Sequence, residues 1–251
     1  MEKENLVLLH GWGMNSKIWH DLIAELKDHF QIYNLDLYEI GDCAYSSPDY
    51  LEKILEQAPR RAHWLGWSLG GMLATQISKQ SPARVQSLVL ISTNVVFCQQ
   101  DDWPNAMDQN IFSAFRRRLV SDSKRTFQEF IQLQFLGTAQ AKRHANALFE
   151  LSQLKKLSRE QLIASLNLLV ALNGITALKN SNLPVLMING ELDKITPIES
   201  VKAIQRLNSR IEVEILKHAG HAPFFSHPKD VAASVMRFLQ SNPALRASLK
   251  M

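Results

Sequence analysis

The chain is poor in cysteine and has no long apolar run. Its two cysteines, Cys43 and Cys98, form no CxxC pair and belong to no cluster with metal-ligand spacing. A disulfide framework and a structural zinc site are therefore excluded, and we expect a reduced, cytoplasmic protein without metal or cofactor. The apolar run nearest the N-terminus, residues 6–9, is too short for a signal peptide or a membrane span. We accordingly expect no membrane association.

The sequence also lacks a linker and a balanced charge distribution. No stretch rich in proline, glycine and serine interrupts its 251 residues, which favours a single domain. Residues 111–180 contain eleven Lys and Arg but only four Asp and Glu, a formal charge of +7, whereas the rest of the chain carries −3. Each basic residue alone is explained by solvation of a helix, but the segment as a whole favours an acidic partner. No nucleic-acid-binding motif accompanies it.

Short apolar runs alternate with helical patterns over much of the chain. The runs are strand-length and rich in Val, Ile and Leu, at residues 5–9, 31–35, 62–67, 85–91, 183–188 and 211–216. Helical spacing follows at 16–29, 48–57, 69–80, 198–207 and 228–239. This alternation predicts an α/β fold with a mostly parallel, doubly wound sheet.

The alternation stops between Ile91 and Leu183, where about ninety residues show helical spacing and no clear strand. An insertion of several helices between two strands must lie over one edge or end of the sheet. We expect a helical cap at about 111–180 above the carboxyl ends of the strands, with the core formed by 1–110 and 181–251. We also expect a monomer.

The stretch HWLGWSLGGM places Ser68 between glycines, directly after a strand-like run and directly before a helical one. Gly66-Trp67-Ser68-Leu69-Gly70 matches G-x-S-x-G, the nucleophile elbow, in the setting that this motif requires. Side chains two positions from the serine would collide in so tight a turn, which explains the glycines. The alternative is a glycine-rich strand–helix turn with an incidental serine.

A serine hydroxyl needs a base to take its proton, and the base needs an acid to orient it. In the chain order Ser, acid, His, the acid candidate is Asp193 and its competitor is Glu191. The base candidate is His221, in a Gly-His-x-Pro sequence after the last strand, with His218 and His227 as rivals.

An oxyanion hole in such a site combines two backbone N–H groups. One belongs to the residue after the nucleophile, Leu69. The other comes from the loop after the first strand, His10-Gly11-Trp12-Gly13, where Trp12 is the expected donor.

The chain resembles the α/β-hydrolase superfamily over nearly its whole length and, within it, the biotin-synthesis carboxylesterases that act on pimeloyl-[acyl-carrier protein] methyl ester. The resemblance rests on LVLLHGWGMNSKIW, LGWSLGGMLA, RTFQEFIQLQFLGT and HAGHAPFFSHP. It implies an α/β-hydrolase fold with a cap inserted after the sixth superfamily strand, a triad of Ser68, Asp193 and His221, and contact of Trp12 and Leu69 with the substrate carbonyl. It also implies an acyl pocket lined by Phe130, Ile131, Gln132, Leu133 and Gln134.

The resemblance further implies that basic cap residues meet the acidic acyl-carrier protein that delivers the substrate. Arg125, Lys142 and Arg143 fall in the matching stretches, whereas Glu129 and Asn146 stand where more positive charge is expected. Other functions remain open: a carbon–carbon bond hydrolase or lyase similar to a menaquinone-pathway synthase, and a non-catalytic ligand-binding protein. A haloalkane dehalogenase is disfavoured, because its nucleophile is an aspartate.

Overall fold

A six-stranded parallel sheet forms the centre of the molecule in the computed structural model, which describes residues 3–41, 48–154 and 156–241. The strand order is β2-β1-β3-β4-β5-β6. The strands are β1 (Glu4–Leu9), β2 (Phe30–Leu35), β3 (Ala62–Trp67), β4 (Val85–Ile91), β5 (Val185–Gly190) and β6 (Glu212–Leu216). Every residue of β3 and β5 is buried, as expected for strands covered on both faces.

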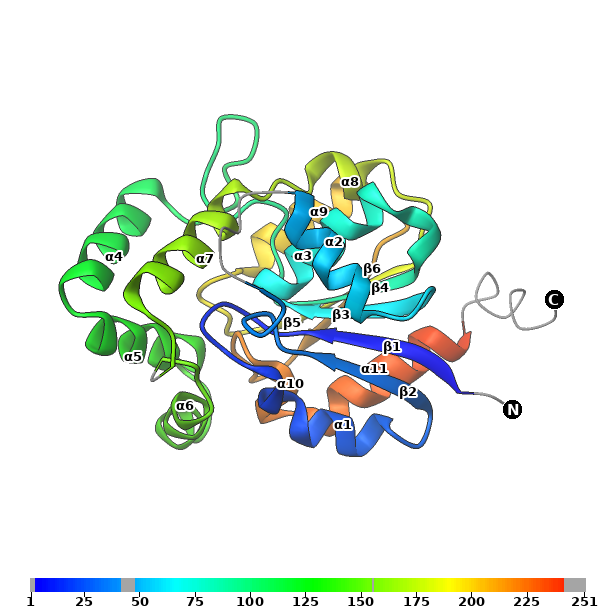
Figure 1. Ribbon diagram of the computed structural model, residues 1–251, viewed down its shortest axis with the longest axis horizontal. Helices are drawn as coiled ribbons and strands as arrows, with labels where there is room; N and C mark the ends of the chain where they lie inside the picture. The colour runs from blue at the N-terminus through cyan, green and yellow to red at the C-terminus, as the bar shows by residue number, and fades with distance from the viewer. Residues whose placement is uncertain (1–2, 42–47, 155, 242–251) are drawn as a thin grey trace.

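Helices cover both faces of the sheet (Figure 1). On one side lie α1 (His20–Leu26) and α11 (Pro228–Ser241), and on the other α2 (Pro48–Gln57), α3 (Leu69–Gln80), α8 (Ile175–Lys179) and α9 (Ile198–Leu207). Short helices η1 (Ser16–Trp19), η2 (Pro82–Arg84) and α10 (Pro223–Ser226) complete this part. The predicted α/β fold with a parallel, doubly wound sheet is confirmed.

The predicted helix at 16–29 is two elements rather than one. Asn15 accepts a hydrogen bond from the Lys17 N–H and begins the 3-10 turn η1, which leads into α1. Because α1 ends at Leu26, the chain turns at once into β2, and residues 27–29 lie outside the helix.

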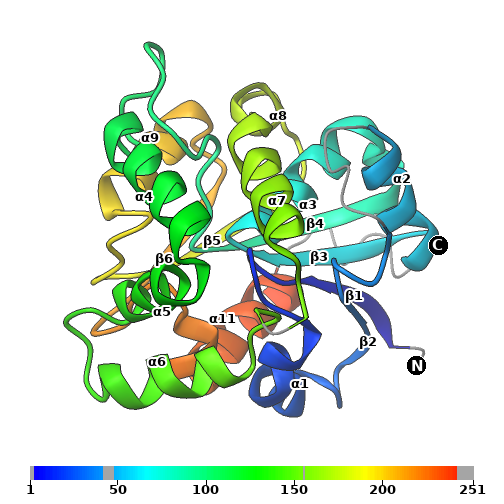
Figure 2. The ribbon, with the colours of Figure 1, turned by 60° about the vertical axis from the view of Figure 1, so that its left-hand side comes forward.

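Four helices between β4 and β5 lie together beyond the carboxyl ends of the strands (Figures 1 and 2). They are α4 (Gln109–Ser121), α5 (Ser123–Gln134), α6 (Ala141–Glu150) and α7 (Arg159–Ala171). In contrast, α8 packs on α3 and α9 beside the sheet. The division of the chain into a core and a cap at about 111–180 remains a prediction.

The buried side chains of the sheet and of α4–α7 form one continuous apolar cluster. It joins Trp64 and Trp67 of β3 to Phe127 and Ile131 of α5. Burial of a side chain of this size stabilises the fold by roughly 1.5–3 kcal/mol. The helices over the strand ends are therefore held by the same core as the sheet, and this positions their residues over the loops described next.

Candidate active site

Ser68 lies at the sharp turn between β3 and α3. Its φ of 51° and ψ of −114° fall in a region that residues other than glycine rarely adopt. Its backbone N–H donates to the Ile91 carbonyl of β4 at 3.0 Å, which holds the turn against the sheet. The side chain is half-buried and faces a pocket.

Close backbone contacts account for the glycines on either side of Ser68. A Cβ at Gly66 would lie 2.4 Å from the Gly70 carbonyl, and one at Gly70 would lie 2.1 Å from the Leu9 carbonyl. No real Cβ approaches backbone atoms so closely. The strand, the turn and the first turn of α3 therefore pack at a distance that only glycine permits.

His221 and Asp193 lie together, on the loops that follow β6 and β5. The distance between His221 Nδ1 and Asp193 Oδ2 is 2.8 Å, and both side chains are almost fully buried. The other carboxylate oxygen of Asp193 accepts the backbone N–H groups of Ile195 at 2.8 Å and Thr196 at 2.9 Å. Both carboxylate oxygens are thus occupied, and the orientation of the carboxylate is fixed.

The His221 loop is anchored through its backbone. The His221 N–H donates to the Gln134 carbonyl at the end of α5 at 2.8 Å, and the Trp67 indole N–H donates to the His221 carbonyl at 2.9 Å. The ring nitrogen Nε2 is buried and has no hydrogen-bond partner among the described residues. Because Nδ1 faces Asp193, Nε2 is left available to a group in the pocket.

The competing acid and bases lie elsewhere. Glu191 is exposed and accepts a hydrogen bond from the His218 backbone N–H at 3.1 Å. His218 itself is exposed, and His227 pairs with the Ser226 hydroxyl at 2.8 Å. The structure therefore brings Asp193 and His221 together and leaves their rivals apart.

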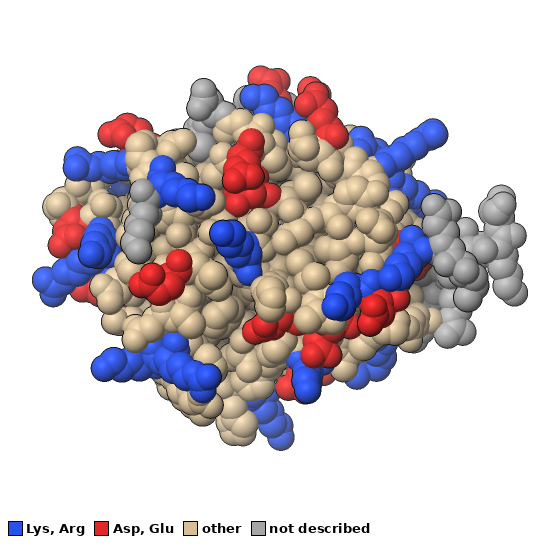
Figure 3. All heavy atoms as spheres, turned by 60° about the horizontal axis from the view of Figure 1, so that its bottom comes forward, with Lys and Arg blue, Asp and Glu red and all other residues tan. Residues whose placement is uncertain are grey.

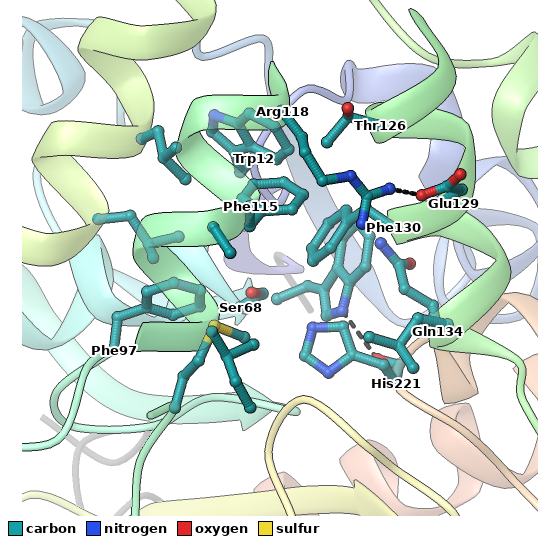
Figure 4. A pocket seen from close by; sticks show the side chains of 17 residues that line it. Trp12, Ser68, Phe97, Phe115, Arg118, Thr126, Glu129, Phe130, Gln134 and His221 are labelled. Atoms are coloured by element: carbon teal, nitrogen blue, oxygen red, sulfur yellow. Dashed lines mark hydrogen bonds and ion pairs between the residues drawn. The ribbon is translucent and has the colours of Figure 1, made fainter. Parts of the chain in front are cut away.

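Ser68 and His221 line the same pocket, which has a volume of about 330 Å³ (Figure 4). Both side chains point into it. The rest of the lining is mostly apolar: Trp12, Trp67, Phe97, Met107, Ile111, Ala114, Phe115, Phe130, Leu133, Leu166 and Leu169, with the polar Arg118, Thr126, Glu129 and Gln134.

The expectation that residues 130–134 all line the pocket is too broad. Phe130, Leu133 and Gln134 do so, but Ile131 is fully buried in the core and Gln132 is exposed to solvent. A contiguous stretch of a helix cannot present all its side chains to one side. An α-helix has 3.6 residues per turn, so successive side chains point in different directions around the axis. The correction follows from the helical geometry of α5.

Sequence reasoning missed the contribution of α4 to the pocket. Ile111, Ala114, Phe115 and Arg118 line it, at positions i, i+3, i+4 and i+7. This spacing is the signature of one helix face and is readable in the sequence. What that face contacts depends on the packing of α4, which the pattern does not specify.

Trp12 lines the same pocket as Ser68, and Leu69 follows Ser68 in the chain. Trp12 is buried, lines the pocket and donates its indole N–H to the Leu162 carbonyl of α7 at 3.1 Å. Leu69 is the buried first residue of α3, so its backbone N–H belongs to the helix N-terminus, where negative charge is stabilised. Their role as oxyanion donors remains a prediction.

The loop that carries Trp12 is supported by His10 and Asp36. The His10 ring accepts the Leu37 N–H at 2.9 Å and lies 3.4 Å from the Asp36 carboxylate. Burial alone would raise the pKa of Asp36, but the neighbouring His10 ring and hydrogen bonds from the Tyr38 and Ser16 amides outweigh it and lower the pKa. Asp36 therefore stays ionised and holds the loop in place.

The three residues predicted to contact a carrier protein lie on the outer surface of α5 and α6. Arg125 is exposed and pairs with Glu129 at 3.0 Å. Arg143 donates to the Gln140 side chain at 2.8 Å, and Lys142 and Arg143 border a shallow hollow together with Asn146. On the face shown in Figure 3, Lys and Arg side chains at the α4–α7 end are interspersed with Asp and Glu.

Residues 6–234 match the Alpha/beta hydrolase family. The chain belongs to this family. The α/β hydrolase is 35% identical over 243 residues to the pimeloyl-[acyl-carrier protein] methyl ester esterase of Yersinia pseudotuberculosis serotype IB, and the match covers 95% of this chain and 94% of that one. It is equally similar to the protein of the same name from Yersinia pestis.

Solved structures share the fold of this hydrolase at low sequence identity. The esterase EaEST from Exiguobacterium antarcticum superposes with a TM-score of 0.83 and 18% identity, covering 95% of this chain and 92% of that one. A bromoperoxidase from Bacillus anthracis reaches 0.82 and 17% over the same shares. The family and its esterase relatives together confirm the predicted enzyme class, a carboxylic ester hydrolase.

Two further observations concern helices that could cross a membrane and side chains that could hold a metal ion. Within residues 3–41, 48–154 and 156–241, no helix has the length and apolarity that crossing a membrane requires. In the same part of the chain, no three His, Cys, Asp or Glu residues gather in a way that would hold a metal ion. Cys98 is buried and unpaired, and burial raises the pKa of its thiol to about 11, whereas Cys43 lies outside the described residues.

Proposed function

We propose that this α/β hydrolase cleaves the methyl ester of pimeloyl-[acyl-carrier protein], releasing methanol, in biotin synthesis. The relatives that carry this name support the proposal, since they match 95% of the chain at 35% identity. The pocket supports it as well, because its apolar lining suits an acyl chain and Ser68 and His221 stand at one end of it.

In the proposed reaction Ser68 is the nucleophile and His221 is the general base. Asp193 accepts a hydrogen bond from Nδ1–H of His221, which leaves Nε2 unprotonated and able to take the proton of the Ser68 hydroxyl as it attacks the ester carbonyl. Asp193 then stabilises the imidazolium that forms. Its own charge is held by the Ile195 and Thr196 amides.

The negative charge that develops on the carbonyl oxygen needs two N–H donors. We assign these to the backbones of Trp12 and Leu69, and loss of one such donor typically costs about 3 kcal/mol of transition-state stabilisation. His221 next gives its proton to the leaving methanol. Water, activated by the same imidazole, then hydrolyses the acyl-enzyme and frees the carboxylate.

The carrier protein that delivers such a substrate is acidic, and we assign its contact to the basic outer surface of the cap, including Arg125, Lys142 and Arg143. The excess of +7 in residues 111–180 supports this assignment, because opposite charge raises the rate of encounter. We further propose that the enzyme is cytoplasmic, in keeping with its low cysteine content, and that it is a monomer.

The pairing of His221 with Asp193, with Nε2 left without a partner in the pocket that Ser68 also lines, is the observation that carries the proposal. It is tested by Ser68→Ala with p-nitrophenyl acetate as substrate. We expect kcat to fall by roughly 10⁴-fold or more. Ser81→Ala, at the opposite end of α3, is the control and should retain activity. Substantial turnover by Ser68→Ala would refute the assignment.

A further inference from the structure

Polar side chains line the pocket at two places, one of which holds Ser68, His221 and Gln134. The other holds an ion pair between Arg118 of α4 and Glu129 of α5, with Thr126 beside it (Figure 4). Phe115 and Phe130 lie between the two places. A ligand that fills the pocket therefore passes from one polar end, across apolar rings, to another.

Helical geometry fixes the position of this ion pair. Arg118 shares a face of α4 with Ile111, Ala114 and Phe115, all of which line the pocket. On α5, Glu129 precedes Gln134 by five residues, which places it about 7.5 Å farther along the helix axis. Since the Gln134 carbonyl binds the His221 amide, the ion pair lies well away from the reacting groups.

The ion pair also stands where the pocket opens to the surface. A shallow outer hollow is lined by Arg118, Ser121, Asp122, Arg125, Thr126 and Glu129, and three of these residues also line the main pocket. Arg118 and Glu129 have exposed side-chain fractions of 56% and 38%. The part of a substrate that continues out of the pocket would cross this rim.

The guanidinium of Arg118 retains donors for a ligand. Glu129 is shared, because one of its oxygens pairs with Arg118 and the other accepts Arg125 Nε at 3.0 Å. An arginine has five N–H donors, and an ion pair this exposed contributes little to stability. Arg118 can therefore donate to an oxygen of the substrate without the loss of a strong interaction.

We propose that Arg118 is a specificity-determining residue that binds an oxygen at the far end of the acyl chain, and that Glu129 limits its charge. The substrate class is then an ester whose chain ends in a second carbonyl or carboxylate, in preference to an ester of a plain alkyl acid. This inference rests on the proposed function, since it places the scissile ester at Ser68.

The test compares two methyl esters of equal chain length, monomethyl pimelate and methyl heptanoate. Arg118→Gln should lower kcat/KM for monomethyl pimelate by about tenfold or more, chiefly through KM, and change that for methyl heptanoate by less than about twofold. Glu129→Gln removes the competing carboxylate and should raise kcat/KM for monomethyl pimelate only. Arg117→Gln removes the same charge from an exposed neighbour that does not line the pocket and should leave both substrates unaffected.

Inhibition of p-nitrophenyl acetate hydrolysis by the same two esters reports binding even if their turnover is slow. A purely structural ion pair predicts that Arg118→Gln and Glu129→Gln weaken both esters alike, and this result, or no change in either, would overturn the inference. Ser68→Ala separates the two proposals. If it abolishes hydrolysis while the Arg118 variants do not discriminate, only the specificity inference fails, whereas an active Ser68→Ala overturns the proposed function itself.

Discussion

The hydrogen bonds around Asp193 fix the orientation of its carboxylate. One of its oxygens faces His221 and the other accepts two backbone amides of its own loop, so the side chain has no freedom to turn. Glu191, two residues earlier, has neither contact and lies in solvent. The two acids are distinguished by their surroundings and not by their chemistry.

Asp193→Asn should therefore lower kcat for p-nitrophenyl acetate by roughly 10⁴-fold, because an amide can hold His221 in the wrong tautomer. The fold should survive, since the asparagine oxygen can still accept the Ile195 and Thr196 amides. Glu191→Gln serves as the matched control, and its kcat should remain close to that of the unmodified enzyme. Equal losses in the two variants would show that the acid has been misassigned.

At this scale the sequence predicts residues that belong to motifs and misses those that depend on packing. Ser68 and His221 stand in glycine-containing motifs at the ends of predicted strands, so their meeting in one pocket could be anticipated. Arg118 has no motif, and its place in the pocket depends on how α4 lies over α5. Ile131 and Gln132 are expected in the pocket only as parts of a stretch, and the helix turns them away.

Among the elements, the junction of β3 and α3 is the most tightly constrained. Gly66→Ala would push a methyl group to 2.4 Å from the Gly70 backbone. We expect the free energy of unfolding to fall by at least about 3 kcal/mol, together with loss of esterase activity, because the turn that carries Ser68 must open. Chemical denaturation followed by circular dichroism measures the first effect.

Gly137→Asn provides the comparison for this variant. Gly137 has a positive φ of 85° but open space around it, since a Cβ added there would lie 3.9 Å from its nearest neighbour, Cδ1 of Leu192. Asparagine tolerates this backbone conformation, so its cost should stay below about 1 kcal/mol. If Gly66→Ala were equally mild, close packing at the junction would not be the reason for its glycine.

The strands and the helices that cover the sheet are predicted more closely than the helices over the strand ends. Runs of Val, Ile and Leu that end in a Gly, Asp, Ser or His loop locate all six strands of the sheet to within two residues at each end, because buried parallel strands are apolar throughout. Helical periodicity identifies the region 92–182 but not how α4–α8 are arranged within it. Its phenylalanines pack both inward on the sheet and around the pocket, so their spacing alone does not define a single buried face.

For the molecule as a whole, the distribution of charge is visible in the sequence but its geometry is not. The excess of positive charge in residues 111–180 is countered locally, since Glu129 pairs with both Arg118 and Arg125. Lys142 and Arg143 of α6, in contrast, form no ion pair within the part of the chain that the structure describes. Lys142 and Arg143 are exposed at the edge of their hollow.

Reversal of both charges, Lys142→Glu with Arg143→Glu, should lower kcat/KM for a carrier-protein-bound methyl ester by about tenfold at low ionic strength. The difference should shrink as salt is added, because screening removes the attraction. Hydrolysis of p-nitrophenyl acetate should not change. The same reversal at Arg60 and Arg61, exposed residues before β3 that border a different hollow, should have little effect on either substrate.

Two hydrogen bonds hold the backbone of His221, and they have a consequence for redesign of the enzyme. One comes from the sheet, through Trp67, and the other from the last residue of α5. The inserted helices are therefore not a detachable accessory. A minimal enzyme without these helices would lose one of the two hydrogen bonds that hold the backbone of His221, the proposed general base. Any helical segment transplanted in their place would have to reproduce the final turn of α5 before its new specificity could be of use.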